Sequence, residues 1–282
     1  MQEGTLQRKI LKIICQDGIG LIAKITNICY QNKLNILENN EFIDHYASLL
    51  FMRTELEGVF YKDIFLTELY KVLPKGFICE LHSLRRRKII VLVSKEWHCL
   101  GDLLIKSSYG ELEVDIIAVI GNHENLRRLV ENFEIPFIFL SHEGLTRLEQ
   151  DNKISANVDF YKPDYIVLAK YMRILTPEFV DRYPDKIINI HHSFLPAFVG
   201  ARPYNQAYER GVKIIGATAH YVNHKLDSGP IITQDTVHVD HNYTAVDMMR
   251  VGRDIEKNVL NRALYQILTQ RVFIQNNRTI VL

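Results

Sequence analysis

An amide and an imidazole, Asn189 and His191, stand two residues apart in the second half of the 282-residue chain. They follow the apolar pair Ile187-Ile188, which is typical of a short buried strand. Because side chains two apart on a strand share a face, Asn189 and His191 should project to one side and His192 to the other. Ligands of open α/β sheets bind at the carboxyl ends of strands. The pair therefore predicts a polar site; the alternative is two satisfied polar groups at a strand end.

A carboxylate, Asp227, adds a second kind of chemistry. It lies in the Leu-Asp-Ser-Gly-Pro loop of residues 226–230, between two strand-like runs. Its side chain could activate water or hold an imidazolium, although an aspartate in such a loop can also simply form the turn. A third feature is Leu-Ala-Lys-Tyr-Met-Arg-Ile-Leu at residues 168–175, after another strand. It could hold a flat ring, and the alternative is a strand end packed beneath a helix.

The sequence lacks the usual patterns of metal and nucleotide sites. Histidines cluster late in the chain, but His220 and His224 straddle a strand end and no HExxH motif occurs, so we expect no metal. The turn at residues 93–102 contains neither GxGxxG nor GxxxxGKS, which excludes a standard dinucleotide or P-loop site. We therefore expect no nucleotide cofactor held by such a motif.

Composition limits the partners of the chain. It is 47% hydrophobic and 24% charged with a formal net charge of +1, so no global field attracts nucleic acid or an acidic membrane. The 4 cysteines are scattered without paired spacing, which indicates reduced thiols in a cytoplasmic protein. No run of about 18 apolar residues predicts a membrane span.

The length predicts two domains, with a boundary at the basic run Arg85-Arg86-Arg87-Lys88, which we interpret as a solvated linker. The elements expected before it are a strand (6–15), a helix (21–31), a β-ribbon (34–44 and 48–57), a helix (61–73) and a strand (77–84). This order predicts a ferredoxin-like βαββαβ domain.

Beyond the boundary, short continuous apolar runs alternate with helical patterns. The runs are residues 89–93, 114–120, 137–140, 165–169 and 187–190. Such alternation indicates a parallel sheet covered on both faces. Residues 213–222 and 230–239 predict an antiparallel addition, and residues 245–269 a long helix with Thr244 as its N-cap. The fold class is therefore α/β, with a Rossmann-like second domain whose sheet is mostly parallel.

Three ordered motifs resemble those of the 10-formyltetrahydrofolate-dependent formyltransferases. They are Asn-x-His-x-Ser-x-Leu-Pro (189–196) followed by Gly-Ala-Arg-Pro (200–203), Gly-Ala-Thr-Ala-His-Tyr-Val (216–222), and Leu-Asp-Ser-Gly-Pro-Ile-Ile (226–232). The resemblance covers residues 88–282. In the glycinamide ribonucleotide formyltransferases the first βα turn is rich in Gly and Ser and holds the substrate phosphate. Residues 94–102 depart from that pattern, and we expect residues 95–102 to close the acceptor site so that water is the only acceptor.

The N-terminal third resembles an ACT domain, a small amino-acid-sensing module, through Asp-Gly-Ile-Gly-Leu-Ile-Ala-Lys-Ile at residues 17–25. An ACT domain (1–84), a linker (85–88) and a formyltransferase-like domain (89–282) resemble the formyltetrahydrofolate deformylase family, and residues 39–42 and 141–147 are also similar to it. The resemblance implies hydrolysis of 10-formyltetrahydrofolate to formate and tetrahydrofolate. It further implies that the enzyme supplies formate for purine synthesis and balances the one-carbon folate pool.

The resemblance also implies roles for individual residues. Asp227 would activate water, Asn189 and His191 would stabilise the oxyanion, and neither a metal nor another cofactor would be needed. Ser193 has no base patterned to it, so we expect a structural role. Apolar residues would line the folate pocket, namely Leu168, Met172, Ile174 and Leu175.

An ACT domain implies amino-acid effectors, here glycine and methionine, and a homo-oligomer formed through that domain. The candidate effector-binding residues are Asp17, Gly18, Gly20, Asn39 and Asn40. Three alternatives stay open. The chain could transfer the formyl group to an amine, its N-terminal domain could be a purely structural dimerising module, or it could be an amino-acid-binding regulator with an inactive second domain.

Overall fold

The computed structural model describes residues 5–197 and 203–282. These residues form two compact units. The first takes in the described chain up to Arg85 together with Thr269–Phe273 and Ile280–Leu282, and the second takes in the remainder from Arg86 onward. The sequence assigned all of 89–282 to the second domain, so the return of the C-terminal residues to the first unit was not predicted. No helix in the described ranges is long and apolar enough to cross a membrane.

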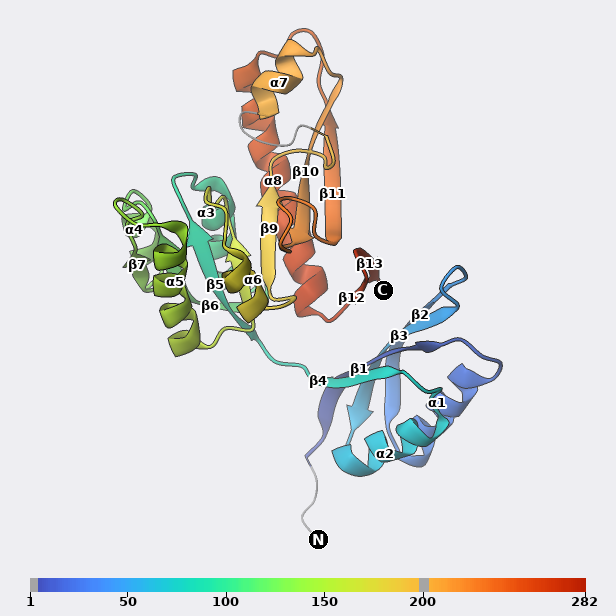
Figure 1. Ribbon diagram of the computed structural model, residues 1–282. Helices are drawn as coiled ribbons and strands as arrows, with labels where there is room; N and C mark the ends of the chain where they lie inside the picture. The colour runs from blue at the N-terminus through green and yellow to red at the C-terminus, as the bar shows by residue number, and fades with distance from the viewer. Residues whose placement is uncertain (1–4, 198–202) are drawn as a thin grey trace. The chain divides into compact units, whose positions relative to one another are not determined.

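The first unit contains a four-stranded antiparallel sheet in the order β2-β3-β1-β4 (Figure 1). Its elements are β1 (Gln7–Gln16), α1 (Leu21–Gln31), β2 (Asn35–Asp44), β3 (Leu49–Gly58), α2 (Lys62–Val72) and β4 (Ile78–Ser83). This is the ferredoxin-like arrangement that the sequence predicted. The mixed α/β fold class is thus observed.

The alternation of side chains along β3 explains how both faces of this sheet are covered. Leu50 and Met52 join the apolar core that includes residues of α1 and α2. Phe51 and Arg53 point to the other face, where the ring of Phe273 meets Phe51 edge to face at 5.8 Å. Nε of Arg53 donates to the carbonyl of Thr269 at 3.2 Å, so the C-terminal segment packs on this face.

The second unit is built on a seven-stranded sheet in the order β11-β10-β9-β8-β5-β6-β7 (Figure 1). Strands β5 to β9 run parallel, whereas β10 and β11 are antiparallel additions at one edge. The strands are β5 (Arg87–Val93), β6 (Val114–Gly121), β7 (Phe137–Phe139), β8 (Tyr165–Leu168), β9 (Ile187–His191), β10 (Ile214–Tyr221) and β11 (Ile231–His238). The helices are α3 (His98–Ser108), α4 (Arg127–Glu131), α5 (Arg147–Tyr161), α6 (Pro177–Arg182), α7 (Pro203–Glu209) and α8 (Ala245–Leu268).

Both faces of the large sheet are covered, as the continuous apolar strands predicted. Ile90 and Leu92 of β5 pack against α5 and α6, while α3 and α8 cover the opposite face (Figure 1). The long helix α8 begins as predicted, because Thr244 Oγ1 accepts from the backbone N–H of Asp247 at 3.2 Å.

Two features of the chain differ from the predictions. Arg87 and Lys88 open β5 and are not a solvated linker, because Arg87 lies 3.4 Å from Asp164 and the backbone N–H of Lys88 donates to the same carboxylate. A short hairpin, β12 (Val272–Gln275) and β13 (Arg278–Val281), follows α8. Its strands are too short to give a clear period in the sequence.

Candidate active site

Asn189 and His191 lie at the carboxyl end of β9, where the parallel part of the sheet meets the antiparallel addition. Neighbouring β10 places His220 directly opposite Asn189. Nδ1 of His220 is 2.8 Å from the carbonyl of Tyr221, so we assign its ring hydrogen to Nδ1. Nε2 of His220 then accepts from the Asn189 amide at 3.2 Å. The histidine therefore fixes the orientation of this amide.

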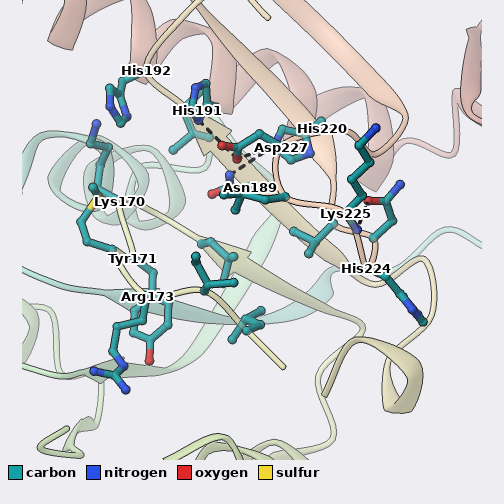
Figure 2. Close-up of a pocket in the computed structure, with 18 residues that line it drawn as sticks. Lys170, Tyr171, Arg173, Asn189, His191, His192, His220, His224, Lys225 and Asp227 are labelled. Atoms are coloured by element: carbon teal, nitrogen blue, oxygen red, sulfur yellow. Dashed lines mark hydrogen bonds and ion pairs between the residues drawn. The ribbon is translucent and has the colours of Figure 1, made fainter. Parts of the chain in front are cut away.

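Asp227 comes from the loop between β10 and β11 and reaches the same place. Its backbone has a φ of 52°, a left-handed conformation that aspartate tolerates better than most residues. The backbone of this loop packs closely against the end of β10, since a Cβ at Gly229 would lie 1.8 Å from the carbonyl oxygen of Tyr221. Oδ1 of Asp227 lies 3.4 Å from Nδ1 of His191 and 3.8 Å from Nε2 of His220. The three predicted catalytic side chains thus converge (Figure 2).

Burial and the neighbouring histidines together set the charges of the site. Burial opposes ionisation of Asp227, but the hydrogen bond from His191, followed by electrostatic interactions with the neighbouring imidazoles, outweighs it and lowers the pKa of the carboxyl. Burial lowers the pKa of His220 despite the Tyr221 carbonyl and Asp227, so this ring is neutral at pH 7. Nε2 of His191 is buried and has no hydrogen-bond partner in the described chain. The site therefore holds an ionised carboxylate and an unused ring nitrogen.

A cavity of about 250 Å³ opens over these side chains. The residues after β8 form one wall, and the loop that carries Asp227 forms another (Figure 2). The four residues predicted for the apolar wall all line it, namely Leu168, Met172, Ile174 and Leu175. The structure thus brings the predicted catalytic and apolar residues into one cavity.

His192 departs from the prediction that it faces away from the site. Strand β9 ends at His191, so the alternation of a strand no longer applies to the next residue. The rings of His191 and His192 stack with centroids 5.0 Å apart, and both line the cavity. The hydroxyl of Ser193 donates to the carbonyl of Ala197 at 2.7 Å. Gly200, Ala201 and Arg202 of the second half of this motif lie outside the described residues.

Another carboxylate, the buried Glu256 of α8, lies near the site. It accepts from Tyr204 at 2.6 Å and pairs with His98 at 2.7 Å and with Lys170 at 3.1 Å. In the described part of the chain, His98, Cys99 and Glu256 form one group with metal-ligand potential. Burial raises the pKa of the Cys99 thiol well above its usual value, and the Glu256 oxygens are already engaged. These donors suit an ion-pair network better than a cation.

Comparison with known proteins places this geometry in a family. Residues 87–264 match the family described as formyl transferase. A relative from Escherichia coli (strain K12) named formyltetrahydrofolate deformylase is 66% identical over 278 residues, which cover 99% of each chain. A relative of the same name from Bacillus subtilis (strain 168) is 40% identical and covers 99% of this chain and 95% of its own. The chain belongs to the formyltetrahydrofolate deformylase family.

Solved structures separate the deformylases from their transferase neighbours. The crystal structure of a formyltetrahydrofolate deformylase from Pseudomonas syringae pv. tomato str. DC3000 has a TM-score of 0.92 at 38% identity and covers 99% of this chain and 95% of that chain. A glycinamide ribonucleotide transformylase from Symbiobacterium toebii has a TM-score of 0.67 at 29% identity, and covers 70% of this chain and 94% of that chain. The likeness to deformylases therefore extends over both units.

The candidate effector residues do not converge within one chain. Asp17, Gly18 and Gly20 lie in the β1–α1 turn, where the N–H of Asp17 donates to the Ser48 carbonyl at the start of β3. Asn39 of edge strand β2 pairs with Thr54 of β3. Thr54 lies five residues beyond Leu49, the residue with which β3 begins next to Ser48. At about 3.3 Å per residue, this places the two sets roughly 16 Å apart along the strands.

Two features of this deformylase-family site were missed from the sequence. His220 was considered only as a metal ligand, although its place in the Gly-Ala-Thr-Ala-His motif, on a strand next to Asn189, was a usable signal. The Lys170–Glu256 pair left no signal, because its partners are 86 positions apart (256 − 170) and meet only through the packing of α8.

Proposed function

We propose that this chain hydrolyses 10-formyltetrahydrofolate to formate and tetrahydrofolate. The observation that carries the proposal is the convergence of Asp227, His191 and Asn189 on one cavity. Nε2 of His191 has no partner in the described chain, and one amide hydrogen of Asn189 remains after its contact with His220. Family membership over the whole chain supports the same reaction. By the same family argument, the enzyme would supply formate for purine synthesis and balance the one-carbon folate pool.

The chemistry of an N-formyl group suits these donors. Attack of water on the formyl carbon forms a tetrahedral oxyanion, which hydrogen-bond donors held in a buried site stabilise strongly. One amide hydrogen of Asn189 is used by His220 and the second remains for the oxyanion. Nε2 of His191, which has no partner in the described residues, faces the same cavity and supplies the second donor.

Asp227 activates the attacking water in this mechanism. Its lowered pKa keeps the carboxylate ionised at neutral pH, so it accepts a hydrogen bond from water and balances charge on His191. As the oxygen of water bonds to the formyl carbon, its proton becomes acidic enough for the carboxylate to take. The bond from carbon to N10 then breaks, N10 takes the proton that Asp227 removed from water, and formic acid leaves and ionises to formate. These residues perform each step without a metal or a further cofactor.

The pterin ring would occupy the apolar part of the cavity. Leu168 and Leu175 line this part of the cavity. Met172 and Ile174 also line it, and because they are 60% and 45% exposed, the bound ring would cover them. Burial of such side chains contributes about 25 cal/mol per Å² of apolar surface. This area gives the folate affinity without polar contacts to the formyl group.

A formate-release assay tests the proposed reaction. Purified full-length protein with 10-formyltetrahydrofolate and no amine should give equal amounts of formate and tetrahydrofolate, measured with formate dehydrogenase and by absorbance. Formate dehydrogenase detects no product of a transfer reaction. Consumption of the substrate only after an amine is added would support the formyltransferase alternative instead.

We further propose that the first unit is an ACT domain that binds glycine and methionine and joins chains into a homo-oligomer. Because the two candidate sets are separated within one chain, a site that uses both requires two copies. Strand β2, which carries Asn39 and Asn40, is an edge strand, and Oδ1 of Asn40 is buried without a partner in the described chain. Isothermal titration and formate-release rates with each amino acid test this. If titration gives no binding heat and the rate of formate release does not change, the domain is purely structural.

A further inference from the structure

A second cavity adjoins the candidate active site along the carboxyl edge of the large sheet. It has a volume of about 570 Å³ and lies over the ends of β5 and β6, beside α8. The two cavities share residues that follow β8 and β9, next to the point between β5 and β8 where the order of strands reverses, and ligands of α/β sheets bind near such points. Both are lined by Lys170 and His192, together with Met172 and Arg173. These residues therefore form the wall between the cavities.

Lys170 is fixed in this wall against the preference of its backbone. Its φ is 62°, a left-handed conformation that favours glycine, and yet the residue is a lysine that is only 8% exposed. Its ammonium lies 3.1 Å from Glu256. Residues held in such conformations persist where the surroundings determine them, and they concentrate at functional sites.

The surroundings of Glu256 are arranged to keep this pair in place. The Tyr204 hydroxyl and the His98 ring complete the hydrogen bonds of the carboxylate. Gly252 makes room for this arrangement, since a Cβ there would lie 2.1 Å from the Tyr204 hydroxyl. If the ammonium of Lys170 moved out of the wall, the carboxylate of Glu256 would stay buried without this cation.

We propose that the Lys170–Glu256 pair determines the acceptor of the reaction by excluding amines in favour of water, an inference that rests on the proposed hydrolysis. Lys170 lies beside His192, which stacks on His191 (Figure 2). A nucleophile in the second cavity would have to cross this wall to come within about 3–3.5 Å of the formyl carbon. The ammonium blocks that path and repels a protonated amine, whereas water reaches the carbon from the side of Asp227.

The excluded reaction is defined chemically. The nitrogen of an amine would bond to the formyl carbon, the bond from that carbon to N10 would break, and the proton lost by the amine would go to N10. The product is a formamide in place of formate. The ratio of the two products therefore measures which acceptor the site admits, independently of the overall rate.

The test measures this ratio with hydroxylamine and with glycinamide as added amines. Lys170→Gly opens the wall and removes the backbone strain, and we expect it to raise the ratio of formylated amine to formate at least tenfold over the unmodified protein. Lys170→Arg retains the charge and should leave the ratio unchanged. Lys162→Gly is the matched control, because Lys162 also has a left-handed φ, of 50°, and lines neither of these two cavities.

The outcomes separate this inference from the proposed function. An unmodified protein that releases no formate would overturn the proposed hydrolysis. Formate release with the same product ratio in Lys170→Gly would overturn the role of Lys170 and leave hydrolysis intact. If Lys170→Gly does not fold, the double variant Lys170→Gly with Glu256→Gln opens the wall and removes both charges together, and the same tenfold criterion decides.

Discussion

Two carboxylates, the partly buried Asp227 and the buried Glu256, lie over the same edge of the large sheet, and their surroundings differ. Glu256 has three partners at 2.6–3.1 Å, from Tyr204, His98 and Lys170. Asp227 has imidazole nitrogens at 3.4 and 3.8 Å, and one of those rings keeps an unpaired Nε2 in the described chain. Native structures satisfy their buried polar groups, so an incomplete set indicates a place kept for a ligand. The complete network stabilises the fold, and the incomplete one performs the chemistry.

The largest effect on stability should follow from breaking the complete network. Glu256→Gln leaves the ammonium of Lys170 buried without an anion, and we expect the free energy of unfolding to fall by about 3–5 kcal/mol. Urea denaturation measures this. Asp254→Asn, an exposed carboxylate on the same helix, is the control, with a change within about 0.5 kcal/mol. A loss below about 1 kcal/mol in Glu256→Gln would contradict the stabilising role of the network.

The incomplete network should respond in rate and not in stability. His191→Ala removes a donor to the oxyanion, and we expect kcat to fall on the order of a hundredfold or more. Steady-state formate release measures this, with the exposed His241→Ala as control. Equal rates in the two variants would show that His191 does not act on the formyl group.

His220 should have a smaller effect, because it acts by positioning Asn189. Its hydrogen bond to the amide is worth about 1.4 kcal/mol at most, so His220→Ala should lower kcat about tenfold with little change in KM. A double variant with Asn189→Ala should be no slower than Asn189→Ala alone, since the two act as one unit. Additive losses would show that His220 contacts the substrate itself.

The last effect concerns pH and the wall between the cavities. Burial, then Lys170 and His191, lower the pKa of His192 to about 3, against about 6.5 in an unfolded chain. The stability that this group contributes is present above pH 6.5 and is lost as pH falls toward 3, because only the unfolded chain then binds the proton. His192→Gln should flatten the decline by about 1.4 kcal/mol per pH unit across this window, measured by urea denaturation at pH 4–6. Identical slopes would show that His192 takes up a proton in the folded protein.

Local patterns predicted much of this fold. The helix at residues 21–31 was placed correctly by its apolar stripe, and the strands that were predicted fall within two residues of their expected bounds because their residue patterns are local. The convergence of Asn189, His191 and Asp227 on one cavity was expected from strand ends and from the resemblance of the motifs. Patterns of this kind are carried by neighbouring residues, so the sequence alone displays them.

Features that depend on packing were not predictable. The stacking of His192 on His191 depends on where β9 ends, and one residue of uncertainty in a boundary reverses the expected direction of a side chain. The Lys170–Glu256 pair depends on the position of α8 over α3, and the packing of Phe273 on Phe51 joins residues more than two hundred positions apart. No local pattern encodes such pairs.

The most direct measurement of the central claim is single-turnover formate release by Asp227→Asn. Asparagine tolerates the left-handed φ of 52°, so this variant should fold and bind folate like the unmodified protein. We expect its rate to fall by about 10³-fold or more, while Asp235→Asn, an exposed aspartate paired with Arg262, keeps the full rate. Formate release by Asp227→Asn at the rate of that control would contradict the assignment of Asp227 as the group that activates water.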